Sequence, residues 1–280
     1  PASSPLSGRG RCAIRRCIMA VTMKILGILN ITADSFSDGG KYLAPEAALA
    51  HAQKLTGDGA DILDIGAASS HPDAQPVSPQ DEIARLSAIV PALKAQGASI
   101  SIDSFHTPVQ RWALAMGAYY LNDIHGFADA SFYSELAASP AKLIVMHAIQ
   151  AQGIATREDV PPGEIMARVF AFFDARLAAL ENAGIARERL ILDPGMGFFL
   201  GTNPETSMTV LGRLPELTRR YGLPLLVSVS RKSFLKALAG ADPERLRSLS
   251  AAAEAMAVKQ GGAAYVRTHE PAALRRGLTP

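Results

Sequence analysis

Residues 61–72 read DILDIGAASSHP, and this stretch sets the pattern on which the whole chain is built. Its first half is a short, mostly aliphatic run without regular polar alternation, which is typical of a strand covered on both faces. Its second half consists of small and polar residues, which is typical of a loop. Similar runs recur along the chain at residues 24–29, 99–102, 119–121, 142–146, 189–192, 225–229 and 264–266.

Helical patterns separate most of these runs. Apolar residues recur at helical spacing in residues 45–56, 81–96, 163–183 and 204–221. Ser78 stands where a helix N-cap is expected, and glycines at positions 97, 117, 184 and 222 follow the ends of helical patterns. Strands that alternate with helices predict a parallel sheet. Eight such units in 280 residues predict an α/β fold, a single-domain (β/α)8 TIM barrel, with an open doubly wound sheet as the alternative.

The two ends of the chain differ from its body. Residues 1–22 are rich in arginine, contain both cysteines (Cys12 and Cys17) and precede the first acidic residue, Asp34. We expect them to be a non-native or disordered N-terminal extension, with an organelle transit peptide as the alternative. The barrel then occupies residues 23–280. Its last helix has room for barely two turns, so we expect a truncated or vestigial final helix.

Composition excludes several classes of protein. The net charge of +2 is too small to indicate nucleic-acid binding, which needs a clustered basic face. The sequence contains no run of about eighteen or more apolar residues, so we expect no membrane span. The body of the chain has no cysteine, so we expect neither disulfides nor a thiolate metal site, as suits a cytoplasmic protein.

Polar side chains follow the predicted strands at the point where each strand ends. A single aspartate in such a place is more often a helix cap or a turn residue than a catalytic group. Here every strand end carries a polar or small residue, and in a parallel barrel these ends meet at one mouth. The sequence therefore predicts a site formed by residues from the whole chain, including Asn30, Asp103, Asn122, His147, Asp193, Ser228, Ser230 and Arg267.

Residue types indicate the chemistry of this mouth. Arg267 and His269 follow the last strand, where barrels commonly bind phosphate. Asn30 is a candidate Mg²⁺ ligand or, alternatively, a turn-stabilising side chain. Carboxylate and amide groups at the other strand ends can pair with a nitrogen-rich heterocycle. Lys232 can donate to a ring carbonyl or serve as a Schiff-base lysine.

Seven segments together resemble dihydropteroate synthase, in that family's order and spacing, from about Met23 to the end of the chain. They are NITADSFSDGG (30–40), DILDIGAASSHP (61–72), SIDSF (101–105), LNDIHGF (121–127), ILDPGMGF (191–198), SVSRKSF (228–234) and VRTH (266–269). The resemblance implies a pterin-binding barrel, acting in folate biosynthesis in the cytoplasm. The implied substrates are a hydroxymethyl-dihydropterin pyrophosphate and 4-aminobenzoate, and the implied partner is a second copy of the chain in a homodimer.

The resemblance also assigns roles to residues. Four side chains would grip the pterin ring: Asp103, Asn122, Asp193 and Lys232. Arg267 would cover the ring and, with His269, bind the pyrophosphate, to which Ser70 would donate. Asn30 would hold Mg²⁺. Of all these, the predicted catalytic residues are Asp103, Asp193, Lys232 and Arg267.

The 4-aminobenzoate subsite would be lined by Pro72, Phe198 and Ser233, with Phe36 in a loop that closes over it. Two positions depart from the family pattern. His71 replaces a usual arginine beside the implied phosphate position, and a second bulky aromatic residue, Phe199, follows Phe198 beside the 4-aminobenzoate subsite. Both are similar to the sulfonamide-insensitive branch of the family. Because sulfonamides are bulkier than 4-aminobenzoate at one end, we expect reduced sulfonamide binding.

Three other functions fit the same pattern. One is a pterin-binding methyltransferase that passes a methyl group to a corrinoid. Another is a Schiff-base aldolase that uses Lys232. The third is a pterin-binding paralogue without turnover.

Overall fold

Eight short strands, buried on both faces, form the centre of the molecule in the computed structural model, which describes residues 23–31 and 45–278. Their positions agree with the predicted apolar runs to within a few residues. The strands are β1 (Lys24–Asn30), β2 (Ile62–Gly66), β3 (Ile100–Asp103), β4 (Tyr120–Asp123), β5 (Lys142–Met146), β6 (Leu190–Asp193), β7 (Leu226–Val227) and β8 (Tyr265–Thr268).

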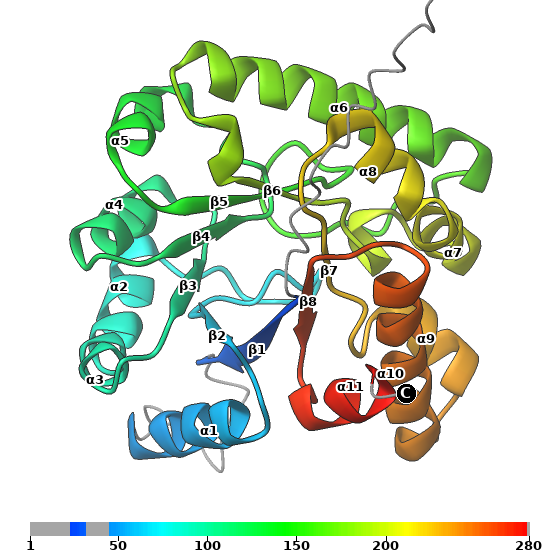
Figure 1. Ribbon diagram of the computed structural model, residues 1–280, viewed down its shortest axis with the longest axis horizontal. Coiled ribbons are helices and arrows are strands. Elements are labelled where there is room, and N and C mark those ends of the chain that lie inside the picture. The colour runs from blue at the N-terminus through cyan, green and yellow to red at the C-terminus, as the bar shows by residue number, and fades with distance from the viewer. Residues whose placement is uncertain (1–22, 32–44, 279–280) are drawn as a thin grey trace, which may run out of the picture.

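All the strand pairs are parallel, and the strand order is β6-β5-β4-β3-β2-β1-β8-β7. The two edge strands approach each other: Leu192 bridges to Leu225, and the N–H of Leu192 donates to the carbonyl of Pro224 at 3.0 Å. The sheet is therefore nearly closed, with helices around its outside (Figure 1). The predicted barrel is confirmed, and the open doubly wound sheet is wrong.

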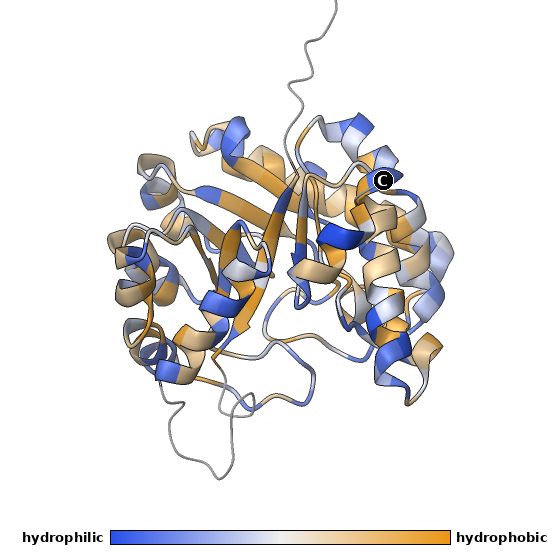
Figure 2. Cartoon of the chain, turned by 60° about the horizontal axis from the view of Figure 1, so that its bottom comes forward, coloured by the Kyte–Doolittle hydropathy of each residue, from blue (hydrophilic) through white to orange (hydrophobic). Residues whose placement is uncertain are grey.

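The helices are α1 (Pro45–Gly57), α2 (Pro79–Ser87), α3 (Val90–Ala95), α4 (Thr107–Ala115), α5 (Tyr133–Ala138), α6 (Pro162–Asn182), α7 (Pro204–Gly212), α8 (Leu214–Tyr221), α9 (Ser233–Ala239), α10 (Pro243–Lys259) and α11 (Pro271–Leu278). Hydrophobic residues concentrate on the strands, and hydrophilic residues gather on the helices and loops around them (Figure 2). The predicted cap is confirmed, since the Ser78 hydroxyl accepts from the N–H of Asp81 at 3.1 Å. The glycines at 97, 117, 184 and 222 all have positive φ, as helix-ending residues need.

Two predicted helices are each two helices in the structure. Residues 81–96 form α2 and α3, and residues 204–221 form α7 and α8. The breaks lie just before Pro91 and Pro215, which stand in the first turns of α3 and α8. Proline has no backbone N–H and its ring clashes with the preceding turn, so it is tolerated at a helix start but not inside a helix.

The interior of the barrel is layered, and this layering places the site. A lower layer of apolar side chains fills the barrel: Leu26, Ile62, Tyr120, Ile144, Ile191, Leu226 and Tyr265. Because side chains alternate along a strand, the next inward position is two residues further on. On β2, β4, β6 and β8, and directly after β7, that position is polar: Asp64, Asn122, Asp193, Arg267 and Ser228. The apolar floor therefore supports a polar layer at the carboxyl ends of the strands.

The C-terminal helix α11 has the short length expected, and its Leu274 packs on Ile25 of β1 and Val266 of β8. Residues 1–22, on which we predicted an extension, lie outside the described residues. Within the described ranges, no helix combines the length and the apolar character that crossing a bilayer requires.

Candidate active site

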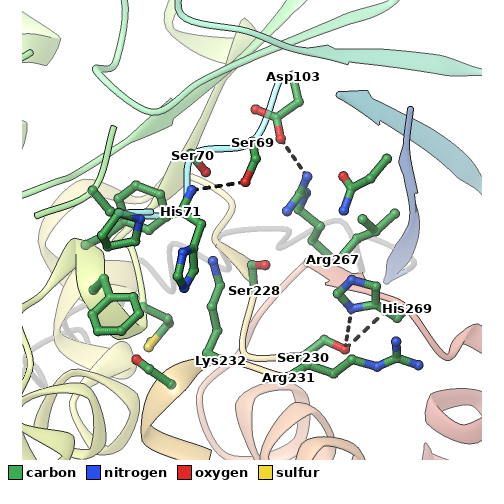
Figure 3. Close-up of a pocket in the computed structure, with 18 of the residues that line it drawn as sticks. Ser69, Ser70, His71, Asp103, Ser228, Ser230, Arg231, Lys232, Arg267 and His269 are labelled. Carbon is green, nitrogen blue, oxygen red and sulfur yellow. Dashed lines mark hydrogen bonds and ion pairs between the residues drawn. The ribbon is translucent and has the colours of Figure 1, made fainter. Parts of the chain in front are cut away.

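A cavity of about 590 Å³ opens at the carboxyl ends of the strands (Figure 3). Eleven of the predicted site residues line it: Asn30, Ser70, Pro72, Asp103, Phe198, Ser228, Ser230, Lys232, Ser233, Arg267 and His269. A narrower inner pocket continues toward the barrel floor and is lined by two further predicted residues, Asn122 and Asp193. The structure thus brings these residues together from both halves of the chain. Phe36 lies outside the described residues.

Strand register explains how three of these side chains meet. Asn30 stands beside Gly66, Gly66 beside Asp103, and Asp103 beside Asn122. Gly66 has no side chain, which leaves room between its two neighbours. A Cβ placed on Gly66 would lie 3.7 Å from Oδ1 of Asn30 and 3.6 Å from Oδ2 of Asp103, so the two oxygens converge on one space.

Asp64 is a site residue that the sequence analysis missed. Its side chain is fully buried, and its Oδ2 accepts from Nε of Arg267 in a short ion pair and from Nδ2 of Asn122 at 3.4 Å. Arg267 also donates from Nη2 to Oδ2 of Asp103 at 2.6 Å, as Figure 3 shows. A charged residue in the middle of a buried strand, two positions before the strand end, was the available signal.

Burial shifts the pKa of several of these groups toward neutrality. Burial raises the pKa of Asp103 to about 7, with Arg267 opposing the shift and Asp64 adding to it. Burial also raises the pKa of Asp193 to about 6. The N–H of Gly195 donates to Oδ1 of Asp193 at 2.8 Å, and this hydrogen bond opposes the shift. The pKa of Lys232 falls to about 8, through burial and the nearby charge of Arg267. These groups can therefore exchange protons near neutral pH.

The inner pocket presents polar atoms that need a ligand. Oδ1 of Asn122 and Oγ of Ser228, which line this pocket, are buried and have no hydrogen-bond partner within the described part of the chain. Buried polar atoms are normally paired, because leaving them unpaired costs free energy. A flat heterocycle with several N–H groups would satisfy them, with Asp193 and Lys232 close by.

Three cationic side chains, Arg231, Lys232 and Arg267, line the cavity together with His269. Lys232 and Arg267 also reach the inner pocket. Nδ1 of His269 pairs with Oγ of Ser230 at 3.0 Å (Figure 3). Burial and the charge of Arg231 lower the pKa of His269 to about 3, so its imidazole is neutral at physiological pH. These side chains suit an anionic group such as a phosphate.

The outer rim is aromatic. Phe198 lies in the short turn η4 (Gly197–Phe199), with the His71 ring edge-on at 5.6 Å and the Arg157 guanidinium 5.7 Å from its centroid. Arg157 also pairs with Asp73, at 2.8 Å from its Nη1, and so connects the β5–α6 loop to the β2–α2 loop. Phe199 follows Phe198 in the same turn, and the amine of Lys232 is 4.9 Å from the Phe199 ring centroid.

The residues present fit a magnesium ion that is only partly coordinated by protein atoms. Within the residues described, no group of three or more His, Cys, Asp or Glu side chains is arranged to hold a metal ion. Mg²⁺ needs few protein ligands when it also binds substrate phosphates and water. The oxygens of Asn30 and Asp103 that converge beside Gly66 are of the type it prefers.

His147, at the end of β5, does not line either part of the cavity. It is buried, its Nδ1 pairs with the carbonyl of Pro194 at 3.1 Å, and burial lowers its pKa to about 4. Its place beside the β6–α7 loop indicates a structural role for its neutral ring.

Comparison with known proteins agrees with this geometry. Residues 26–269 match the family model described as "Pterin binding enzyme". The chain is 57% identical to dihydropteroate synthase type-2 of Escherichia coli over 93% of this chain and 95% of that protein. Two solved structures of dihydropteroate synthase from Xanthomonas albilineans are also similar. The one with 4-aminobenzoic acid has a TM-score of 0.82 and 36% identity, and the one with 7,8-dihydropteroate has 0.78 and 34%; each covers 92% of this chain and 91% of the other.

Proposed function

This chain belongs to the dihydropteroate synthase family, and from that premise we propose how its cavity condenses a hydroxymethyl-dihydropterin pyrophosphate with 4-aminobenzoate. The products are dihydropteroate and pyrophosphate. The observation that carries the proposal is the layered site: a buried polar pocket for a heterocycle directly below a cationic wall for an anion. The two halves of one substrate, a ring and a diphosphate, need this pair of environments.

The pterin ring would lie in the inner pocket. Asp193 and the oxygen of Asn122 would accept hydrogen bonds from its N–H groups, and Lys232 would donate to its carbonyl. Asp103 lies at the boundary with the upper cavity, where the methylene carbon that reacts would stand. An ionised carboxylate there stabilises positive charge that develops on the ring and its methylene.

The diphosphate would leave toward the cationic wall. When the C–O bond breaks, the electron pair stays on the pyrophosphate oxygen, and Arg267, His269 and Ser70 would bind the developing charge. We further propose that Asn30 holds Mg²⁺, which when bound supplies charge neutralisation to the diphosphate. The amine of 4-aminobenzoate then forms the new C–N bond with the methylene carbon and loses one proton, which the released pyrophosphate can take up. None of these proposed steps forms a covalent bond between the substrate and the enzyme.

The aminobenzoate would occupy the outer rim, against Pro72, Phe198 and Ser233, with Phe36 as a further predicted contact. We propose that sulfonamides bind less well there. The Phe198 ring is held from two sides, by His71 and by Arg157, so it cannot easily move to admit a larger group. Replacement of Phe198 by Ala should then increase inhibition by a sulfonamide while 4-aminobenzoate remains a substrate; equal inhibition of both proteins would contradict this part of the proposal.

Release of pyrophosphate on mixing both substrates tests the function directly. Wild type should release pyrophosphate only when both are present, and Lys232→Ala should lose at least about tenfold in kcat/KM, because one buried charged hydrogen bond to the ring disappears. Lys54→Ala, on the outer surface, is the matched control. A corrinoid methyltransferase or an aldolase would release no pyrophosphate, and a paralogue without turnover would bind the pterin and release none. The cytoplasmic location and the homodimer stay predictions.

A further inference from the structure

Helix α10 packs beside α9 and α11 (Figure 1). It carries three polar side chains on one face. Arg247, Ser250 and Glu254 follow one another at spacings of three and four residues, which places them on the same side of a helix. We call them the α10 polar face. Ser250 and Glu254 are only 3% and 1% exposed. Burying such groups is costly unless they are bonded, so their partners indicate their purpose.

Ser250 supports the loop after β7. Arg231 there has a φ of 57°, a left-handed conformation that is unfavourable for a residue with a side chain. Its N–H donates to Oγ of Ser250 at 3.2 Å, which holds this backbone in place. At its other end the guanidinium of Arg231 pairs with Glu270, whose carboxylate also lies 3.7 Å from Nε of Arg247. The α10 polar face therefore holds the backbone of Arg231 directly, through Ser250, and its guanidinium indirectly, through Glu270 and Arg247.

Glu254 supports the end of β8. It is hydrogen-bonded to the side chain of Thr268, which is fully buried and stands between Arg267 and His269. Oγ1 of Thr268 already accepts the N–H of Glu270 at 3.1 Å, so its hydroxyl hydrogen is free to donate to Glu254. Burial raises the pKa of Glu254 to about 8, so this acid is neutral at pH 7.

We propose that Ser250 and Glu254 are positioning residues that set the geometry of the diphosphate-binding wall. Neither lines the cavity; each fixes a segment that does, the first through Arg231 and the second through the Arg267–His269 segment. The inference rests on the proposed function for that wall. Its physical basis is that groups which stabilise a leaving anion must be held in place before charge develops.

Pro72 and Phe198 of the 4-aminobenzoate rim lie on other loops, and Ser233 lies in the first turn of α9, so the effect should fall mainly on the pterin diphosphate. Ser250→Ala removes the acceptor for the N–H of Arg231, and a lost hydrogen bond of this kind corresponds to about a fivefold change. We expect KM for the pterin diphosphate and the inhibition constant of inorganic pyrophosphate each to rise about fivefold, with KM for 4-aminobenzoate unchanged within about twofold. Ser248→Ala, exposed on the same helix, is the matched control and should change none of these.

Glu254 provides an independent second variant. Glu254→Gln keeps an oxygen that accepts from Thr268 and should behave like wild type at pH 7, whereas Glu254→Ala should weaken pyrophosphate inhibition as Ser250→Ala does. The inference is overturned if Ser250→Ala and Glu254→Ala leave pyrophosphate inhibition at the wild-type value. It is equally overturned if both KM values rise together in proportion to a loss of thermal stability, since that pattern is purely structural.

The failure of the proposed function is recognised separately, in wild type alone. Wild type that releases no pyrophosphate from the two substrates, and does not bind inorganic pyrophosphate in a calorimetric titration with Mg²⁺, would remove the premise and the inference together. Wild type that does both, with Ser250→Ala indistinguishable from Ser248→Ala, would overturn only the inference.

Discussion

Replacing Asp64 by asparagine should move the pH dependence of the reaction to lower pH. Asp64 and Asp103 both bond to the guanidinium of Arg267, so two carboxylates share one cation. Burial is the main reason why the pKa of Asp103 is raised to about 7, and the charge of Asp64 adds to it. Asparagine keeps the size of the side chain and an oxygen for Arg267, but it removes the like charge. Asp103 is then the single carboxylate bonded to Arg267, and its ionised form is more stable than in wild type.

The size of the shift follows from this shared contact. Oxygens bonded to neighbouring nitrogens of one guanidinium lie on the order of 5 Å apart, and at an effective dielectric constant of about 20 two such charges repel by roughly 3 kcal/mol. That corresponds to at most about two pH units. Once the pKa of Asp103 has fallen below that of Asp193, which is raised to about 6, Asp193 limits the activity at low pH. The charge of Asp64 also contributes to the raised pKa of Asp193, so this limit falls as well, and the visible shift should be about one pH unit or slightly more.

The assay is kcat/KM for the pterin diphosphate between about pH 5 and 9, at saturating 4-aminobenzoate. Because the ionised carboxylates are the active forms, the value should first rise with pH, and the midpoint of this rise should be near pH 7 in wild type and near pH 6 in Asp64→Asn. Above about pH 8 it should fall in both proteins, because Lys232 loses its proton. Asp174→Asn, which removes a carboxylate 46% exposed on α6, is the control and should keep the wild-type midpoint. A midpoint in Asp64→Asn that stays at the wild-type pH, or that rises, would refute the reasoning.

Three further predictions concern stability and the rim of the cavity. Glu254 keeps its proton in the folded chain up to about pH 8 but loses it above about pH 4.5 when unfolded, so wild type loses stability as pH rises between these values. The melting temperature of Glu254→Gln relative to that of wild type should therefore increase from pH 5 to 8. A difference that stays constant over this range would contradict this. Reversing either charge of the Asp73–Arg157 pair should raise KM for 4-aminobenzoate a few-fold, and exchanging both residues should restore it; if the exchanged protein is as impaired as the single variants, the pair does not support the rim. Gly195→Ala should lower stability by about 3 kcal/mol or more in denaturant titration, because φ is 74° and the new Cβ would lie 2.4 Å from the carbonyl oxygen of His147; a loss below about 1 kcal/mol would show that the loop can relax.

Most errors of the sequence analysis were in helix boundaries, and they were avoidable. The helical patterns at 81–96 and 204–221 continue through Pro91 and Pro215, because hydrophobic spacing says nothing about backbone hydrogen bonding. The proline ring alone decides where these helices break. The two prolines were sufficient to predict both breaks, but hydrophobic periodicity had been given more weight.

The sequence by itself determined the barrel and the edge at which its chemistry lies. Aliphatic runs that end in Asn30, Asp103 and Asp193 read as buried strands followed by polar residues, and parallel strands place all such ends on one side. Both properties are local, because they depend on the residue types within a few positions of each other. They could therefore be recognised without knowing where any strand lies in space.

Only the tertiary structure decided which of these groups interact. Arg267 bonds to Asp64 and Asp103, which precede it by 203 and 164 residues, and no local pattern connects the three. Likewise Ser250 and Glu254 look like ordinary helix residues until the fold places them behind Arg231 and Thr268. Burial and Coulomb interactions depend on distance in space, and that distance is set by the closure of the whole barrel.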